Sequence, residues 1–150
     1  MKTLSKDITT KKETGRFYTP VFIVDNILDL SGYCGEIILK KHVIDNSCGD
    51  GAFLRQIVKR YCEEFLKICP DTECLKKDLE QFVHGIEIEA TEHQKCLKNI
   101  SLIAETFGVY DVEWDVLCAD ALSIEKYDGK MDFVLGNPPY VSVHNLGDNF

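Results

Sequence analysis

The amino-acid sequence predicts an α/β fold, in which the strands of a parallel sheet alternate with helices along the chain. Short apolar segments rich in β-branched residues recur over the 150 residues, and segments with apolar residues at helical spacing lie between them. The connections are short, and no repeat or low-complexity segment interrupts the alternation. One apolar segment, residues 133–135, has no polar position, as expected of a strand covered by helices on both faces.

The first half of the chain contains two predicted helices and one predicted strand. We expect Thr19 to cap the first helix, Pro20 to occupy its first turn, and Ser31-Gly32 to end it. Residues 42–45, HVID, are predicted to form a short strand. The next helix starts near Gly51 and carries apolar residues on one side, namely Phe53, Leu54, Ile57, Val58, Tyr61 and Phe65.

The second half continues the same alternation. Cys69-Pro70-Asp71 interrupts the helix, and a short charged helix is expected to extend to Glu80. In chain order, the remaining predicted elements are a strand at residues 82–89, a helix at 90–108, a strand at 111–120 and a strand at 131–136.

Charge is distributed unevenly along the chain. The net charge of −8 has the wrong sign for a domain that binds nucleic acid by itself. Residues 1–16 carry five basic against two acidic side chains, so the excess of acid lies in the remainder. We interpret residues 1–14 as a basic, solvated arm and residues 15–150 as one domain. A contact between the arm and nucleic-acid phosphates is the alternative.

Cysteine usage and apolar content favour a cytoplasmic protein. The chain has seven cysteines and no C-x-x-C pair, which argues against a disulfide framework and against a metal site. No segment reaches the ~18 consecutive apolar residues of a membrane helix. The first residues are basic but lack the apolar core of a secretory signal.

A glycine-containing turn follows the first predicted strand. The stretch DNSCGDG contains Asp45, Cys48, Gly49 and Gly51, and such a turn lets the backbone approach a ligand at the start of a helix. Leu54 occupies the third glycine position of the dinucleotide fingerprint, which argues against a nicotinamide or flavin cofactor. The alternative interpretation is an ordinary connection between a strand and a helix.

Acidic residues follow the next two predicted strands. The strand at residues 82–89 ends in Glu87 and Glu89, where a carboxylate can accept hydrogen bonds from ribose hydroxyls; one of the two acids is expected to be only a solvated charge. Asp120 lies where the exocyclic amine of adenine could donate to it. Because ligands of open α/β sheets bind at the carboxyl ends of the strands, these acids predict a site for an adenosine-containing ligand other than a dinucleotide.

Five short motifs follow one another along the chain: GRFYTP at residues 15–20, DNSCGDGAFL at 45–54, GIEIE at 85–89, CADAL at 118–122 and NPPY at 137–140. Taken in this order, they resemble the motifs of the DNA adenine-N6 methyltransferases of restriction–modification systems. Two positions depart from the family pattern: Asn46 replaces a proline, and Asp50 replaces a small hydroxyl residue. Asp50 adds negative charge near the methionine end of the implied cofactor.

The resemblance implies a fold and a cofactor. The fold is the class I methyltransferase fold, a Rossmann-like parallel sheet, of which this chain would form the N-terminal half with four strands in the order 3-2-1-4. The cofactor is S-adenosylmethionine. The residues implied to bind it are Tyr18, Thr19, Asp45, Cys48, Gly49, Gly51, Glu87 and Asp120.

The motif NPPY is implied to carry the chemistry. The carboxamide oxygen of Asn137 and the backbone carbonyl of Pro138 would accept hydrogen bonds from the amine hydrogens of adenine. Pro138 and Pro139 fix the backbone, and Tyr140 offers an aromatic face to a base flipped out of duplex DNA. The alternative is a turn that merely ends a strand, which explains the prolines but not the asparagine.

The sequence also allows other substrates and a non-catalytic role. The motif NPPY also occurs in methyltransferases of RNA bases and of protein glutamine, although those relatives generally lack GRFYTP. Family members continue past this motif with further strands and a target-recognition domain, and residues 1–150 contain neither. We therefore expect residues 1–150 alone to be inactive on DNA, and a cofactor-binding fragment without activity is the other alternative.

Overall fold

Residues 18–138 form a parallel sheet of four strands in the computed structural model, which describes this part of the chain. The strands are β1 (Val43–Asp45), β2 (Val83–Glu87), β3 (Asp115–Cys118) and β4 (Phe133–Val134). They lie in the order β3-β2-β1-β4, and every neighbouring pair is parallel. This order confirms the predicted one. The strands are shorter than predicted, and β4 pairs with β1 over only two positions, Val43 with Phe133 and Ile44 with Val134.

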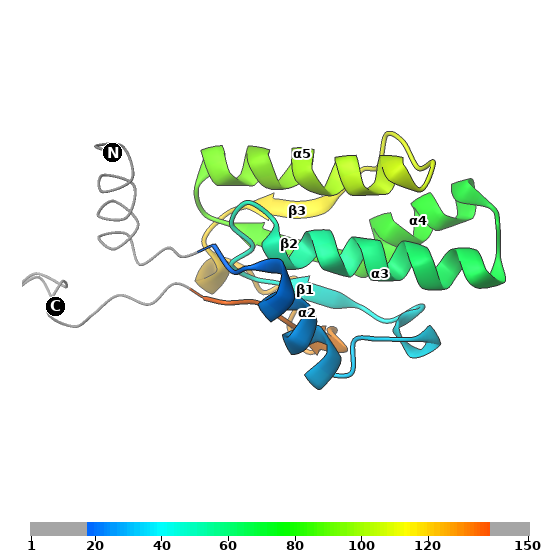
Figure 1. Cartoon of the computed structure of the whole chain (residues 1–150). Coiled ribbons are helices and arrows are strands. Elements are labelled where there is room, and N and C mark those ends of the chain that lie inside the picture. The colour runs from blue at the N-terminus through cyan, green and yellow to red at the C-terminus, as the bar shows by residue number, and fades with distance from the viewer. Residues whose placement is uncertain (1–17, 139–150) are drawn as a thin grey trace, which may run out of the picture.

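Within residues 18–138, four α-helices and two short 3₁₀ helices accompany the strands (Figure 1). The α-helices are α2 (Val21–Leu30), α3 (Ala52–Ile68), α4 (Thr72–Phe82) and α5 (Ala90–Thr106), and the 3₁₀ helices are η1 (Glu36–Ile38) and η2 (Ala121–Ser123). All predicted helices are present. Helix α4 begins where expected because the Asp71 side chain accepts hydrogen bonds from the backbone N–H groups of Glu73 and Cys74.

The predicted capping of the first helix by Thr19 is wrong. Pro20 occupies the N-cap position of α2, and no side chain caps the helix there. The hydroxyl of Thr19 instead accepts a hydrogen bond from the side chain of Asn137, which follows β4. A contact between residues so far apart in sequence leaves no local pattern that would predict it.

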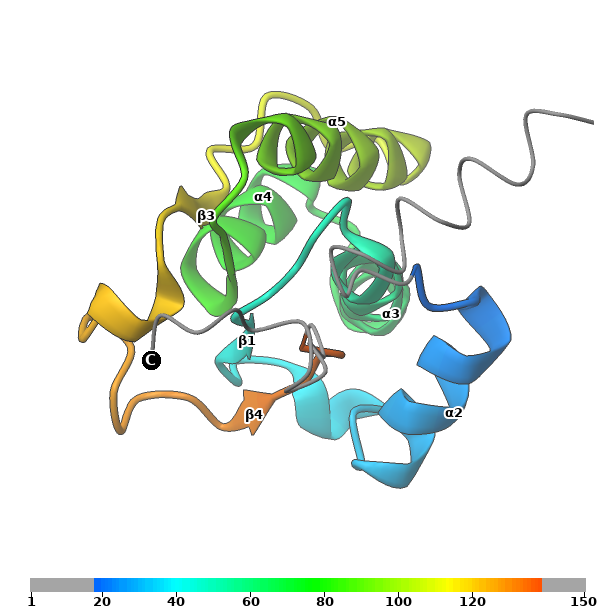
Figure 2. The same cartoon turned by 90° about the vertical axis from the view of Figure 1, so that its left-hand side faces the viewer.

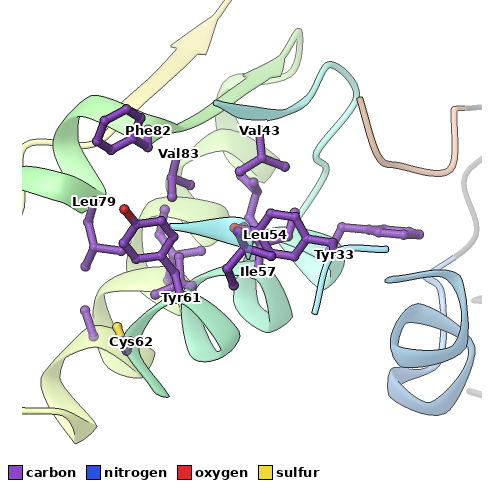
Figure 3. Packing of buried hydrophobic residues seen from close by; sticks show 14 of the residues in the cluster. Tyr33, Val43, Leu54, Ile57, Tyr61, Cys62, Leu79, Phe82 and Val83 are labelled. Atoms are coloured by element: carbon purple, nitrogen blue, oxygen red, sulfur yellow. The ribbon is translucent and has the colours of Figure 1, made fainter. Parts of the chain in front are cut away.

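One face of the sheet is covered by helices and holds the main core. Figure 2 shows α3, α4 and α5 on the same side of the strands, with α2 beside α3. The buried apolar side predicted for α3 faces this core, where Leu54 and Ile57 pack near Val43 and Val83 (Figure 3). This packing fixes the strand ends relative to the start of α3, and therefore fixes the site described below.

The opposite face carries no helix of the kind we predicted, at least within residues 18–138. A small cluster of Ile44, Ile86 and Tyr127 covers it, together with apolar residues of the segment 117–131. Val134 of β4 is 63% exposed, whereas a strand covered on both faces was expected. The difference follows from position: β4 is the edge strand of the described sheet, and the segment that covers the neighbouring strands does not extend over Val134.

Candidate functional site

A cavity of about 490 Å³ is lined by residues at and just after the carboxyl ends of the strands. These ends lie on the left of the sheet in Figure 1. This volume falls within the range of small-molecule sites. Nine residues predicted for the site line the cavity: Tyr18, Thr19, Asp45, Cys48, Gly49, Glu87, Asp120, Asn137 and Pro138. Gly51 does not line it, and Pro139 and Tyr140 lie outside the described residues. The structure thus brings together segments from all five sequence motifs.

The turn after β1 is held by hydrogen bonds to β2. The backbone N–H of Cys48 donates to the carbonyl of Ile86, and the N–H of Gly49 donates to Oε2 of Glu87 at 2.9 Å. Gly49 has a φ of 54°, in the left-handed region that favours glycine. Oε1 of the same carboxylate accepts the N–H of Glu89 at 3.0 Å. Two backbone donors therefore orient a buried carboxylate at the wall of the cavity.

Gly51 faces helix α5 and not the cavity. Its φ of 95° makes it the left-handed N-cap of α3. A Cβ at this position would lie 3.1 Å from Sγ of Cys96 and 3.5 Å from the Cα of the same residue. The resemblance places Gly51 among the residues that bind the cofactor, where an added side chain would obstruct the ligand. The geometry shows that it would instead disturb the packing of α3 against α5, because the turn rotates this glycine away from the ligand side.

Asp45 ends β1 as a buried carboxylate. Its Oδ1 accepts the backbone N–H of Ser47 at 3.0 Å, and its residue is only 1% exposed. Burial raises the pKa of this carboxyl group to about 7; the N–H of Ser47 opposes the shift, and the nearby charge of Glu87 adds to it.

Gly136 passes directly over Asp45, and the sequence analysis did not single it out. A Cβ on Gly136 would lie 2.3 Å from Oδ1 of Asp45 and 2.9 Å from its Cγ, distances that side chains do not adopt. Only a glycine lets the chain leave β4 at this point. A glycine between an apolar strand and the motif NPPY was the available sequence signal.

The segment before α2 forms another wall of the cavity. The hydroxyl of Tyr18 donates to the carboxylate of Glu92, 3.3 Å from each oxygen, and Nζ of Lys95 lies 3.0 Å from Oε1 of that carboxylate. Burial, followed by the charge of Glu92, raises the pKa of Tyr18. Glu92 is buried and lines the cavity, yet sequence reasoning missed it. Its position in the first turn of a helix after β2 was the only signal.

Asn137 and Asp120 complete the opening of the cavity. Nδ2 of Asn137 donates to Oγ1 of Thr19 at 3.2 Å. Asp120 caps η2 by accepting the N–H of Leu122 at 3.0 Å, and the side chain of Leu122 is almost fully exposed beside it. A carboxylate and an exposed apolar side chain thus lie together at the end of β3.

The cavity is strongly acidic. Its carboxylates come from Asp45, Asp50, Glu87, Glu92 and Asp120, and no lysine, arginine or histidine lines it among the described residues. Burial raises the pKa of Asp50, although Arg55 opposes the shift. Such a wall disfavours phosphate-rich ligands and favours a ligand that carries positive charge and hydrogen-bond donors.

Two structural absences hold for residues 18–138. No group of three or more histidine, cysteine, aspartate or glutamate side chains is placed to hold a metal ion there. No helix in this part of the chain has the length and apolarity needed to cross a membrane.

The family of the chain follows from sequence comparison. The N-6 DNA Methylase family matches residues 3–149, and the chain belongs to this family. It is 32% identical over 144 residues to the type II methyltransferase M.BstVI of Geobacillus stearothermophilus. The alignment covers 89% of this chain and 26% of the relative. It is 30% identical over 136 residues to the type II methyltransferase M.PaeR7I of Pseudomonas aeruginosa, and this alignment covers 85% of this chain and 23% of the relative. The chain therefore spans about a quarter of the length of these relatives.

Solved structures confirm the fold class. A nuclease-deletion mutant of the type ISP restriction-modification enzyme LlaGI, in complex with a DNA substrate mimic, matches 86% of this chain with a TM-score of 0.56 and 17% identity. The DrdV–DNA complex matches 75% of the chain with a TM-score of 0.56 and 21% identity. The chain covers 12% and 11% of these two proteins, respectively.

The first prediction concerns the contact between Gly136 and Asp45. Replacing Gly136 with alanine should destabilise the protein by roughly 1–3 kcal/mol, because the new methyl group would overlap the buried carboxylate of Asp45. Thermal unfolding of the complete gene product would measure the change. The double variant with Asp45→Ala should recover part of the loss, since it removes the overlapping atoms. Unchanged stability of Gly136→Ala alone would contradict this account of the contact.

The second prediction concerns the pH dependence of stability. The pKa of Asp45 is about 7 in the folded protein, whereas an aspartate in the unfolded chain has the ordinary value of 3.8. Folding therefore favours the protonated form of Asp45. The resulting contribution to the free energy of unfolding is complete below about pH 4 and is lost as the pH rises through 7. The loss amounts to about 4 kcal/mol for a shift of this size.

Chemical denaturation at several pH values would measure this contribution as a difference between the unaltered protein and Asp45→Asn. The comparison cancels the titration of all other groups. A difference that does not change between pH 4 and 8 would show that Asp45 is not held in the protonated form by burial.

Proposed function

We propose that the gene product containing this chain transfers a methyl group from S-adenosylmethionine to N6 of adenine at specific sites in duplex DNA. The observation that carries the proposal is the acidic cavity at the strand ends with Asn137 at its opening. Family membership supports the same activity. We further infer that residues 15–150 are one cofactor-binding domain, that residues 1–14 are an arm, and that the protein acts in the cytoplasm.

The chemistry of the cavity fits the proposed cofactor. S-adenosylmethionine supplies a methyl group on a positively charged sulfur, and it carries an ammonium group and ribose hydroxyls that donate hydrogen bonds. The carboxylates of Asp45 and Glu87 match these charges and donors. The side-chain oxygen of Ser47 is buried beside the cavity and has no hydrogen-bond partner among the described residues, as expected of a group that bonds to a ligand.

Individual residues take the following proposed roles. Glu87 would accept hydrogen bonds from the ribose hydroxyls, and Asp120 would accept one from the adenine amine of the cofactor. Tyr18, Thr19, Cys48 and Gly49 would form the remaining polar wall. Gly51 would contribute only indirectly, by fixing the start of α3, because its Cβ position faces α5.

Asn137 is the proposed catalytic residue. The lone pair of an exocyclic amine is delocalised into the base, so the amine is a poor nucleophile. The amine would donate one hydrogen bond to Oδ1 of Asn137 and one to the carbonyl of Pro138. These two bonds would draw the nitrogen towards a tetrahedral shape and aim its lone pair at the methyl group of the cofactor. This is positioning and electrostatic stabilisation, and it requires no separate base. Pro139 and Tyr140 keep the roles that the resemblance implies, in fixing the backbone and stacking the flipped base.

Duplex DNA is the proposed substrate, and its recognition is assigned mainly to parts of the protein beyond this chain. The negative net charge of the chain argues against strong contacts with phosphate here. The two relatives extend well beyond the matched region. Membership of the N-6 DNA Methylase family favours DNA over the RNA and protein-glutamine alternatives.

The third prediction separates cofactor binding from chemistry. In the complete gene product, Asn137→Ala should retain S-adenosylmethionine binding in a calorimetric titration but lose methyl transfer by about 10²-fold, by analogy with other preorganised polar groups at reacting centres. Transfer of tritiated methyl groups to unmethylated, mixed-sequence duplex DNA would measure the rate. Asn26→Ala is a matched control, since Asn26 is an exposed asparagine of α2 that does not line the cavity. Normal adenine methylation by the Asn137 variant would refute the proposed mechanism.

A further inference from the structure

Two segments far apart in the sequence meet at the opening of the cavity. Thr19 lies just before α2 and Asn137 lies just after β4, and 118 positions separate them. They are joined by the hydrogen bond from Nδ2 of Asn137 to Oγ1 of Thr19, at 3.2 Å. The hydroxyl makes no capping bond to α2, so its polar contact with Asn137 needs another explanation.

The orientation of a carboxamide decides what it can do for an amine. The oxygen and nitrogen ends of the group have almost the same size, but one accepts hydrogen bonds and the other donates them. If the amide of Asn137 were turned by half a rotation, it would present its NH₂ group to the amine of adenine. Two donors would then face each other, and the proposed positioning of the amine would fail.

We propose that Thr19 is a positioning residue that holds the carboxamide of Asn137 with its oxygen turned towards the substrate amine. A threonine hydroxyl can either donate or accept; in the structure it accepts from Nδ2, and the planar amide therefore directs Oδ1 to the other side of Cγ. This inference rests on the function proposed above. It gives the hydroxyl a role in the chemical step, in addition to the cofactor contact implied by the resemblance.

Both partners of this bond are held by well-packed parts of the molecule. Thr19 precedes Pro20 and α2, and that helix is anchored in the core by Val24 and Leu28, which are fully buried. On the other side, Asn137 directly follows Gly136, whose passage over Asp45 leaves little freedom. A hydrogen bond between two anchored segments can fix an orientation that a flexible pair could not.

Thr19→Val and Thr19→Ser form the matched pair that tests the inference. Valine keeps the shape and the β-branch of threonine but removes the hydroxyl, whereas serine keeps the hydroxyl. The rate to measure is single-turnover methyl transfer to unmethylated, mixed-sequence duplex DNA, with the complete gene product at saturating S-adenosylmethionine. The dissociation constant of S-adenosylmethionine, measured by calorimetry, reports any separate contribution of the hydroxyl to cofactor binding.

The inference predicts a specific pattern across four variants. At saturating cofactor, Thr19→Val should lower the single-turnover rate by roughly 3- to 10-fold, the range for one lost hydrogen bond, and Thr19→Ser should restore most of it. In the Asn137→Ala background, Thr19→Val should have almost no further effect, because its partner is already absent. Such non-additivity in a double-mutant cycle would not arise from a purely structural loss at Thr19.

Three results would overturn the inference. The first is a normal single-turnover rate for Thr19→Val with a weakened dissociation constant, which would assign the hydroxyl to the cofactor alone. The second is full additivity of Thr19→Val with Asn137→Ala. The third is an unaltered protein that binds S-adenosylmethionine but does not methylate adenine, which would remove the proposed function as well. The first two leave that function intact, so the two failures are distinguishable.

Discussion

The close approach of the end of β4 to the end of β1 is the constraint on which the rest of the site depends. Asp45 ends β1 as a buried carboxylate, and Gly136 passes it at a distance that leaves no space for a Cβ. This passage carries the chain from the edge strand directly to Asn137 at the opening of the cavity. The spacing between the acid wall and the amide of Asn137 is thus set by one residue without a side chain. Replacement of that residue must move either the acid or the amide.

Burial of several carboxylates in one cavity carries an electrostatic cost that the fold offsets only in part. Glu87 is oriented by two backbone N–H groups, and Asp45 accepts one from Ser47. Burial raises the pKa of Asp45 although the N–H of Ser47 opposes the shift, so this compensation is incomplete. A ligand with positive charge would complete it, which is why the acid wall and the proposed cofactor belong together. The same wall would repel the phosphates of a dinucleotide.

Much of this arrangement could be predicted from the sequence, because parallel strands bring their carboxyl ends to one edge. That rule alone predicts that Asp45, Glu87 and Asp120 share a site, since each follows a different strand. This rule does not predict whether an individual glycine of the turn faces the cavity or a neighbouring helix. Gly51 belongs to the same turn as Gly49 but faces α5, because its backbone conformation depends on how the two helices pack.

Contacts between segments that are distant in the sequence also could not be predicted from the sequence pattern. The role of Thr19 as a helix cap is a local prediction, and the bond to Asn137 that replaces it depends on the tertiary structure. The exposure of Val134 has a similar cause, since an apolar strand sequence does not reveal what lies over its faces in residues 18–138. The order of the strands needed no such information, because the family resemblance implies it, and the structure confirms it.

The central claim is that the acidic cavity binds S-adenosylmethionine and rejects dinucleotides. The most direct measurement is a calorimetric titration of the complete gene product with S-adenosylmethionine, with S-adenosylhomocysteine and with NAD. Our account predicts saturable binding of the first two at one site per chain and no detectable binding of NAD. Binding of NAD, or no binding of either adenosyl compound, would contradict it.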